Sequence, residues 1–324
     1  MVLVSVVMCC RNHEKYVAAA MDSVLNQTFK DLELLITEDC STDNSAKIIA
    51  DYQKNDPRVH ALFHTKNIGV SQTLNDGLDR VSGKYVCFLD SDDLWVENKL
   101  EKQLKILGKD DTKLLWSEGE VINSQGLKTG ELVTQHIHAL PNKSGCLFEP
   151  LLKELVVFRQ SMIFRADYVE NIRFDPQLKY VNDHLFLVDL AVDHEFLFMP
   201  EILAKYRIHE SNISNRNKLG WAKDKVLIRQ YFLQRYGDKM SSRAKADIKY
   251  QIGFYLSRLG KNEEAKKYYL QALKIDHTHV TSTLYTALML TTGEGFIGKF
   301  LVNSFNATTE LVSNLKTGRM GSKS

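Results

Sequence analysis

The stretch Val86-Cys87-Phe88-Leu89-Asp90-Ser91-Asp92-Asp93 joins four apolar residues to three acids grouped around one serine. A continuous apolar run that begins after a glycine, here Gly83, and ends in charge predicts a strand buried on both faces of a parallel sheet. In an open α/β sheet, ligands bind at the carboxyl ends of the strands, so we expect these acids at a binding edge. Clustered carboxylates repel one another unless a cation or hydrogen-bond donors neutralise them.

A hard divalent cation is the simplest way to neutralise this cluster. Mg²⁺ and Mn²⁺ prefer oxygen ligands, and proteins commonly hold them with one or two carboxylates together with the phosphates of a substrate. The same acids fit a second interpretation, in which Asp92 or Asp93 is the N-cap of a helix predicted over Glu97 to Leu107. Taken alone, the acids favour neither interpretation.

Alternating strand and helix patterns surround this stretch. Apolar runs at Val2 to Met8, Leu32 to Thr37 and Val59 to Phe63 predict three further strands, and apolar residues at helical spacing follow each of them. Such alternation with short connections predicts right-handed βαβ units and a parallel sheet. The second strand also ends in acids, so Asp39 and the cluster at Asp90 to Asp93 are expected to face one cleft.

The pattern loosens in the middle of the chain. Leu114-Leu115-Trp116 predicts another strand, and the glycine-punctuated polar loops after it suit a region that shapes a second substrate site. Asp183 precedes an apolar helix face, where it fits either a helix N-cap or a catalytic group. The extended segment Leu197 to Ile208 leads to His209, and a single histidine is ordinarily a surface or core residue.

After Gly220 the composition shifts to helix-forming residues. The spacing of glycine, alanine and tyrosine in Tyr250 to Lys274 resembles one tetratricopeptide-like unit. Because a free-standing solenoid needs at least about three repeats, we favour a helical pair that packs on the first domain. The tail Thr317 to Ser324 is rich in glycine, serine and lysine and is predicted to be disordered.

Length and composition limit the possible classes of protein. The 324 residues are 44% hydrophobic and carry a net charge of +2, which suits one large α/β domain with an appendage, or two domains, and does not indicate a nucleic-acid-binding protein. No apolar run reaches the roughly 18 residues of a membrane-spanning helix. The five cysteines form no CxxC pair and are predicted to be reduced thiols of a cytosolic protein.

Taken together and in order, the motifs resemble the family 2 glycosyltransferases of the GT-A fold, from Val4 to about Ser214. The matching segments are Val4-Ser5-Val6-Val7-Met8 with Asn12 and Tyr16, Ser23 to Thr28, Glu38-Asp39 with Ser41-Thr42-Asp43, Asn67-Ile68-Gly69, Asp90-Ser91-Asp92-Asp93 at the family's DXD metal motif, Asn182-Asp183 at its acidic pair, and Tyr206-Arg207-Ile208-His209 at its closing motif. The sequence departs from the family at Arg11, where an aromatic is usual, and at Glu38 and Asn182, which replace the usual acids.

The resemblance implies an α/β fold of the GT-A type, with a mostly parallel sheet flanked by helices. It implies a glycosyltransferase domain over residues 1–219, made of a nucleotide-sugar-binding half, 1–113, and an acceptor-binding half, 114–219. A helical region, 220–316, and the tail, 317–324, complete the expected organisation.

The resemblance also assigns roles to residues. Asp183 is expected to be the catalytic base, and Asp92 with His209 is expected to bind Mn²⁺ or Mg²⁺. The residues expected to bind the nucleotide sugar are Cys9, Arg11, Asn12, Glu38, Asp39, Asn67, Gly69, Asp90 and Ser91, and those expected on the acceptor side are Asp93, Trp116 and Asn182. A carboxylate at Asp39 can accept the imide N–H of uracil, which favours a UDP-sugar.

The expected reaction is the inverting transfer of a hexosyl or N-acetylhexosaminyl group to a hydroxyl of a glycan or a lipid-linked acceptor. The resemblance places this reaction in cell-surface polysaccharide or glycoconjugate assembly, by a cytoplasmic protein that can lie on the inner face of the membrane. Membrane or protein contacts are expected through the C-terminal helices.

Three alternatives stay open at the level of sequence. A sugar-nucleotide nucleotidyltransferase would need a glycine-rich basic loop after the first strand, and Arg11-Asn12-His13 contains no glycine. A dinucleotide oxidoreductase is suggested only by Gly293 to Gly298, which fits GxGxxG but follows a helical pattern. The third alternative is an inactive scaffold that binds proteins through its helical C-terminus.

Overall fold

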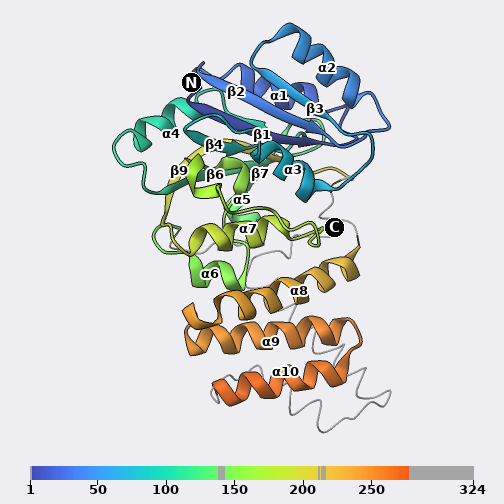
Figure 1. Ribbon diagram of the computed structural model, residues 1–324, viewed down its shortest axis with the longest axis vertical. Helices are drawn as coiled ribbons and strands as arrows, with labels where there is room; N and C mark the ends of the chain where they lie inside the picture. The colour runs from blue at the N-terminus through green and yellow to red at the C-terminus, as the bar shows by residue number, and fades with distance from the viewer. Residues whose placement is uncertain (1, 138–142, 211, 213–216, 277–324) are drawn as a thin grey trace. The chain divides into compact units, whose positions relative to one another are not determined.

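The computed structural model describes residues 2–137, 143–210, 212 and 217–276 (Figure 1). The chain divides into two compact units, Met1–Arg216 and Asn217–Ser324. The first unit contains a nine-stranded sheet with helices on both of its faces, and the described part of the second unit is helical. The predicted α/β fold is therefore confirmed, with additional helices at the C-terminal end.

The first half of the sheet is parallel and follows the order β3-β2-β1-β4. Its strands are β1 (Val4–Cys10), β2 (Leu32–Glu38), β3 (Val59–Phe63) and β4 (Tyr85–Phe88), and its helices are α1 (Val17–Leu25), α2 (Ser45–Asn55) and α3 (Val70–Leu78). The chain moves outward from β1 to β3 and then returns to β4, so right-handed crossovers place α3 on the face opposite α1 and α2 (Figure 1). Strands covered on both faces explain the uninterrupted apolar runs in the sequence.

Helix α3 lies unusually close to the sheet. A Cβ added at Gly77 would be 2.6 Å from Cγ1 of Val7 on β1. Glycine is the residue that allows this approach, and it brings the beginning of α3 next to the end of β2.

The second half of the sheet is mainly antiparallel, so the sheet as a whole is mixed. β4 pairs antiparallel with β8, β8 with β6 and β9 with β5, whereas β6 and β9 are parallel to each other. The strands of this half are β5 (Leu94–Trp95), β6 (Leu114–Ile122), β7 (Lys128–Leu132), β8 (Ile163–Arg165) and β9 (Phe196–Arg207). Its helices are α4 (Lys99–Leu107), α5 (Val133–His136), α6 (Phe148–Lys153) and α7 (Asn182–Ala191), with 3₁₀ turns η1 (Arg159–Ser161) and η2 (Ala166–Val169).

The N-caps of two helices exclude two interpretations that the sequence left open. Strand β5 separates the acidic cluster from α4, whose N-cap is Asn98, so neither Asp92 nor Asp93 caps that helix. The N-cap of α7 is Val181, and Asp183 lies inside the first turn. Neither acidic motif is therefore a helix cap.

The described part of the second unit consists of α8 (Lys218–Tyr236), the 3₁₀ turn η4 (Gly237–Lys239), α9 (Ser242–Arg258) and α10 (Asn262–Ile275). The predicted helix-turn-helix is formed by α9 and α10. Gly260 turns the chain with a φ of +77°, and Gly253 leaves space for the ring of Tyr269, which an added Cβ would approach to 2.6 Å. The predicted disordered tail and the segment Gly293 to Gly298 lie outside the described residues.

All five cysteines lie among the described residues and are unbridged. Cys10 and Cys87 are buried, Cys9 and Cys40 are half-buried, and Cys146 is exposed. Burial raises the pKa of Cys10 to about 12 and that of Cys87 to about 11.

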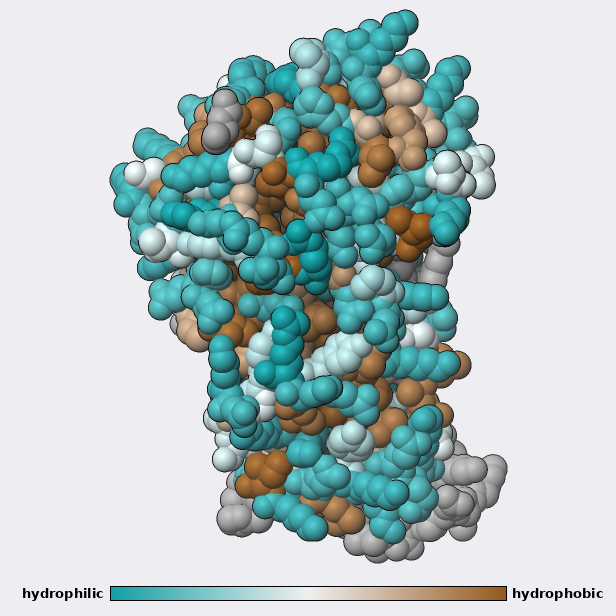
Figure 2. Space-filling view, viewed as in Figure 1, coloured by the Kyte–Doolittle hydropathy of each residue, from teal (hydrophilic) through white to brown (hydrophobic). Residues whose placement is uncertain are grey.

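The face of the molecule in Figure 2 is mostly hydrophilic, with apolar residues in small separate patches. Within the part of the chain that the structure describes, no helix combines the length and the apolar character needed to cross a bilayer.

Candidate active site

The candidate site lies where β1 and β4 end side by side. Val7 pairs with Phe88, and the amide of Leu89 donates a hydrogen bond to the carbonyl oxygen of Val7 at 3.2 Å. The strand order reverses between these two strands, and ligands of open α/β sheets bind at such a switch point. The loop at Arg11 to His13 and the acidic cluster at Asp90 to Asp93 therefore converge on one edge of the sheet.

One carboxylate of the cluster faces two imidazoles. Oδ2 of Asp92 lies 3.0 Å from Nε2 of His209 and 3.8 Å from Nε2 of His13. The ligand atoms of these three residues all lie within 4.8 Å of one another, a spacing that could hold a metal ion. The structure thus brings together the predicted pair Asp92 and His209 and adds His13, which the sequence analysis did not select.

Asp92 and Asp93 are adjacent in sequence, but their pKa values are shifted in opposite directions. Burial opposes ionisation of Asp92, but the hydrogen bond from His209 and the charge of His13 outweigh burial and lower its pKa. Burial and the nearby charges of Asp92 and Asp90 raise the pKa of Asp93 well above its ordinary value. The surroundings therefore favour ionisation of Asp92 and oppose ionisation of Asp93.

Asp93 lies inside the protein, where it connects the two halves of the sheet. The residue is 1% exposed, and its Oδ1 accepts a hydrogen bond from the amide of Arg207 at the end of β9 at 2.8 Å. The Arg207 side chain returns to the same loop, donating from Nε to the carbonyl oxygen of Asp92 at 2.7 Å. These two bonds fix the position of the closing motif relative to the acidic cluster.

Asp39 organises the loop after β3, at the same edge of the sheet. Its Oδ1 accepts a hydrogen bond from the amide of Ile68 at 2.8 Å and lies 3.1 Å from Nδ1 of His64, and its Oδ2 accepts a hydrogen bond from the amide of Gly69 at 2.9 Å. A carboxylate has about four acceptor positions, so these three bonds leave one position at Oδ2. Gly69 has a φ of +91° and is the N-cap of α3, which explains the glycine in this loop.

Three further residues that are predicted to bind the nucleotide sugar shape the loops around Asp39. Oε1 of Glu38 accepts a hydrogen bond from the amide of Ser41 at 2.7 Å, and Oδ1 of Asn12 accepts one from the amide of Thr42 at 2.8 Å. Oδ1 of Asn67 accepts a hydrogen bond from the amide of Gly69 at 3.0 Å. Asn12 thus joins the loop after β1 to the loop after β2, whereas Glu38 and Asn67 each stabilise the turn of their own loop.

Arg159 is an important residue of this site that the sequence analysis missed. It is 6% exposed, donates from Nη2 to Oδ1 of Asp90 at 2.7 Å, and stacks 5.2 Å from the centre of the Phe88 ring. Burial opposes its charge, but Asp90, Asp183 and Cys9 together raise its pKa. The guanidinium is therefore close enough to be influenced by acids from both halves of the sheet.

Arg159 gives little sequence signal because it lies in a short 3₁₀ turn, η1, without periodicity or a motif. Its Nε and Nη1 are buried and have no hydrogen-bond partner. Such unpaired buried donors are costly and are usually retained for a function, which is the structural signal that identifies this residue.

Asp183 and Asn182 begin α7. Oδ1 of Asn182 accepts a hydrogen bond from the backbone amide of Asp183 at 3.0 Å. Asp183 is half-buried in the first turn, where the helix dipole favours the ionised carboxylate.

The other predicted residues differ in their surroundings. Ser91 is buried and lies 2.8 Å from Nδ1 of His13, whereas Arg11 is exposed and Cys9 is half-buried. Trp116 is fully buried in β6, and its Nε1 donates a hydrogen bond to the carbonyl oxygen of Lys143 at 3.0 Å. Its assignment to the acceptor side stays a prediction.

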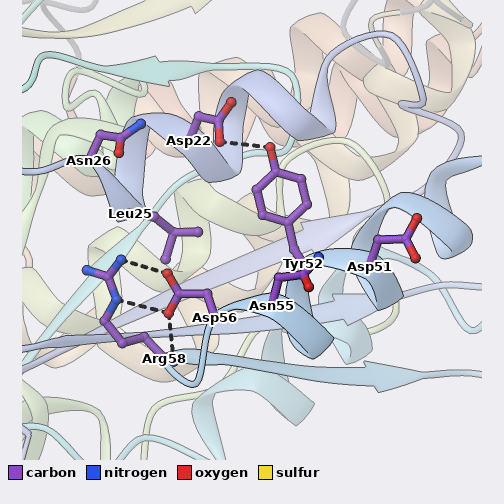
Figure 3. A pocket seen from close by; sticks show the side chains of 8 residues that line it. All are labelled: Asp22, Leu25, Asn26, Asp51, Tyr52, Asn55, Asp56 and Arg58. Carbon is purple, nitrogen blue, oxygen red and sulfur yellow. Dashed lines mark hydrogen bonds and ion pairs between the residues drawn. The ribbon is translucent and has the colours of Figure 1, made fainter.

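A separate surface pocket of about 320 Å³ lies between α1, α2 and the start of β3 (Figure 3). Figure 3 shows two interactions among the residues that line this pocket: the Tyr52 hydroxyl donates a hydrogen bond to Asp22, and Arg58 forms an ion pair with Asp56. None of the predicted site residues lines this pocket. The chemistry-bearing side chains are instead concentrated at the ends of β1, β4 and β9.

The sequence pattern described as Glycosyl transferase family 2 matches residues 5–173, which is more than half of the chain. The chain belongs to this family. This assignment makes the protein a glycosyltransferase, and the loops at the switch point form the candidate active site of a glycosyltransferase domain.

Two curated bacterial proteins illustrate the relationship. The family 2 glycosyltransferase described here is 28% identical over 237 residues to TuaG of Bacillus subtilis (strain 168), whose name assigns it to teichuronic acid biosynthesis, with coverage of 72% of this chain and 91% of the relative. It is 27% identical over 245 residues to WfgD of Escherichia coli, a "UDP-Glc:alpha-D-GlcNAc-diphosphoundecaprenol beta-1,3-glucosyltransferase", with coverage of 72% and 92%.

Solved structures confirm the fold of this glycosyltransferase. Residues 1–349 of S. aureus TarS in complex with UDP-GlcNAc superpose with a TM-score of 0.63 at 16% identity, covering 88% of this chain and 90% of that one. The mannosyltransferase PcManGT from Pyrobaculum calidifontis in complex with GDP-Man and Mn²⁺ gives a TM-score of 0.53 at 14% identity, with coverage of 94% and 86%.

Proposed function

We propose that this family 2 glycosyltransferase moves a sugar from a UDP-sugar to a hydroxyl of a glycan or lipid-linked acceptor, with inversion at the anomeric carbon and with the help of Mn²⁺ or Mg²⁺. The observation that carries the proposal is the sheet edge where β1 and β4 end, at which Asp92 faces His209 and Asp39 lies at the end of the neighbouring strand β2. The family assignment supplies the class of reaction.

Asp92 and His209 are the residues that would hold the metal. They fit a cation because Asp92 is 9% exposed yet favoured in its ionised form, and one of its oxygens faces two imidazole nitrogens. A divalent ion bound there would offset the negative charge that develops on the departing diphosphate. Asp90, held by Arg159, would accept hydrogen bonds from the hydroxyls of the donor ribose or sugar.

Asp39 supports a preference for uracil. The one acceptor position that remains at Oδ2 suits a single imide N–H, which uracil offers and which cytosine and adenine lack at the corresponding ring nitrogen. The titles of the TarS complexes name UDP and UDP-GlcNAc, and the name of WfgD specifies UDP-Glc, which agrees with this choice.

Asp183 would act as the general base. It lies near Arg159, whose charge favours the ionised carboxylate that must accept the proton of the attacking hydroxyl. Transfer by a single displacement inverts the configuration at the anomeric carbon. Asn182 and the buried Asp93 would contribute to the acceptor side through the backbone segments that they fix.

The acceptor class is supported by the relatives alone. WfgD is named for transfer to a sugar linked to diphosphoundecaprenol, and TuaG is named for teichuronic acid biosynthesis. We therefore place this glycosyltransferase in polysaccharide or glycoconjugate assembly.

A donor screen tests the proposal. Purified protein is incubated with UDP-glucose, UDP-GlcNAc or GDP-mannose, with Mn²⁺ or with excess chelator, and released nucleoside diphosphate is measured. We expect release from a UDP-sugar that depends on the metal. Release from no donor would support an inactive scaffold, and formation of a sugar nucleotide from UTP and a sugar 1-phosphate would support a nucleotidyltransferase.

A further inference from the structure

We propose that His13 is a third protein ligand of the metal at Asp92 and His209, and that this set of two imidazoles and one carboxylate binds Co²⁺ or Mn²⁺ ahead of Mg²⁺, before any nucleotide is present. The inference rests on the metal site of the proposed function and extends it to the identity of the ion. His13 follows β1, and Ser91 beside Asp92 lies 78 residues further along the chain, so sequence spacing alone does not reveal a shared site.

The distances suit a common ion. Two ligand atoms that each lie about 2.1 Å from one ion are about 3.0 Å apart in an octahedral site and about 3.4 Å apart in a tetrahedral one. Oδ2 of Asp92 lies 3.0 Å from Nε2 of His209 and 3.8 Å from Nε2 of His13. The shorter separation fits directly, and the longer one closes with a movement of His13 by about half an ångström.

The surroundings of His13 allow the tautomer that a metal needs. Nδ1 lies 2.8 Å from Oγ of Ser91. When the Ser91 oxygen accepts the proton on Nδ1, the lone pair of Nε2 is left free for an ion bound beside Asp92. Metal-binding histidines usually donate their other ring N–H in this way, which fixes the ring and raises its basicity.

The position of His13 is fixed without any ligand. Its backbone amide donates to Oγ of Ser45 at 2.9 Å, and its carbonyl oxygen accepts hydrogen bonds from the amides of Tyr16 and Val17. The His13 ring meets the His209 ring edge to face, with 5.9 Å between centres. The side chain is 21% exposed, so an ion can reach Nε2 from solvent.

The composition of this ligand set predicts selectivity. Mg²⁺ favours carboxylate, carbonyl and water oxygens, whereas imidazole suits transition metals, and affinity for nitrogen ligands rises from Mn²⁺ to Co²⁺. A site in which Asp92 was the single protein ligand would discriminate only weakly between Mg²⁺ and a transition-metal ion. Adding His13 to His209 makes imidazole the majority ligand, so Mg²⁺ should bind weakly until a diphosphate supplies more oxygen.

Calorimetric titration of the full chain, without nucleotide and without a histidine tag, tests this inference. We expect wild-type protein to bind Co²⁺ roughly 100-fold or more tightly than Mg²⁺. His13→Gln should weaken Co²⁺ binding by tenfold or more and Mg²⁺ binding by much less, with loss of intensity in the Co²⁺ d–d absorption. Ser91→Ala, which retains His13 but removes its partner, should weaken Co²⁺ binding by about tenfold.

Controls separate this inference from the proposed function. His60→Gln removes an imidazole that is 48% exposed and far from the cluster in the fold, and it should leave every affinity unchanged. If His13→Gln binds Co²⁺ like wild type, or loses Co²⁺ and Mg²⁺ affinity equally, while Asp92→Asn loses both ions, His13 is not a ligand and the metal site stands. If Asp92→Asn binds Co²⁺ like wild type, the metal site itself is wrong.

Discussion

The two halves of the sheet position their functional carboxylates by different means. In the parallel half, Asp39 follows a strand directly, and its orientation is fixed by three hydrogen-bonding groups from the loop that leads into α3. In the mainly antiparallel half, Asp183 stands in the first turn of α7, and the nearby Arg159 lies in a 3₁₀ turn. Strand ends are fixed by the topology of the sheet, whereas a helix start can move with the loops before it.

This difference suggests a division of labour. A rigid donor side would bind the part of the substrate that many glycosyltransferases share, and an acceptor side built from loops and a helix can change without disturbing the sheet. Arg159 and Arg207 cross between the halves, because each begins in the antiparallel half and bonds to the acidic cluster after β4. The predictions below test how far the two sides are separable.

The largest effect is expected for Asp92→Asn. On the proposed function, loss of the anion would remove the metal and with it several kcal/mol of transition-state stabilisation, so transfer should fall by about 10³-fold or more. Asp93→Asn is the matched control, because Asp93 is favoured in its neutral form and an amide of similar shape should cost less than about fivefold. Steady-state transfer rates measure both, and equal effects of the two substitutions would contradict the electrostatic distinction.

Asp183→Asn should reduce transfer by roughly 10²-fold, in the range of general-base catalysis, while UDP-sugar and metal binding are retained. Since Asp183 is not the N-cap of α7, the variant should unfold near the wild-type temperature. A stable variant with near-normal transfer would show that the base lies elsewhere. Loss of donor binding would show that the two sides are not separable.

Arg159→Lys tests the residue that crosses between the halves. Lysine keeps the charge but cannot reproduce the planar guanidinium that bonds Asp90, and losing a charge-assisted hydrogen bond of about 2 kcal/mol predicts about a 30-fold lower kcat. Donor affinity and transfer rate should both change, because Arg159 also influences Asp183. Arg173 forms an exposed ion pair with Asp79, so Arg173→Lys is the control and should leave kcat unchanged.

Asp39→Ala should have a smaller effect, confined to the donor side. The loss of one hydrogen bond to the base, worth about 1 kcal/mol, predicts about fivefold weaker UDP binding with an unchanged rate at saturating donor. Calorimetry with UDP and CDP measures this change. If the variant binds UDP as tightly as wild type, Asp39 does not bind the nucleobase and only orients the loop before α3.

The smallest effect is expected from deletion of residues 299–324. No donor motif occurs in that segment, so UDP affinity should equal that of the full chain. A folded truncated protein that no longer binds UDP would contradict the restriction of the donor site to the first unit.

The parallel half could be predicted from sequence because each strand and helix there carries its own periodic pattern. The strands β2 (Leu32–Glu38) and β4 (Tyr85–Phe88) are mostly apolar, and the acids after them, Asp39 and Asp90, mark the edge of the sheet without any knowledge of long-range contacts. The antiparallel half was harder to predict. β8 has three residues and β5 has two, so neither gives a detectable pattern, and both depend on partners distant in sequence.

The same contrast applies to the candidate site. Asp92 and His209 could be selected because they lie in segments that resemble family motifs, and the structure brings them to 3.0 Å. His13 and Arg159 lie in short turns, where a single residue carries no pattern, and only the folded chain shows their neighbours. The sequence pattern did not reveal that Trp116, assigned to the acceptor side by the resemblance, is fully buried in the fold.

The unequal burial of the thiols makes a selective chemical label possible. Only thiolates react readily with maleimides, and the raised pKa of Cys9, Cys10 and Cys87 disfavours their reaction at neutral pH. Of the two remaining thiols, Cys40 is half-buried, so the exposed Cys146 should react first. Cys146 is exposed and follows Gly145, which bridges to Phe196 at the start of β9. A fluorophore on Cys146 would therefore sit beside the strand that leads to His209, giving an optical reporter that requires no engineered cysteine.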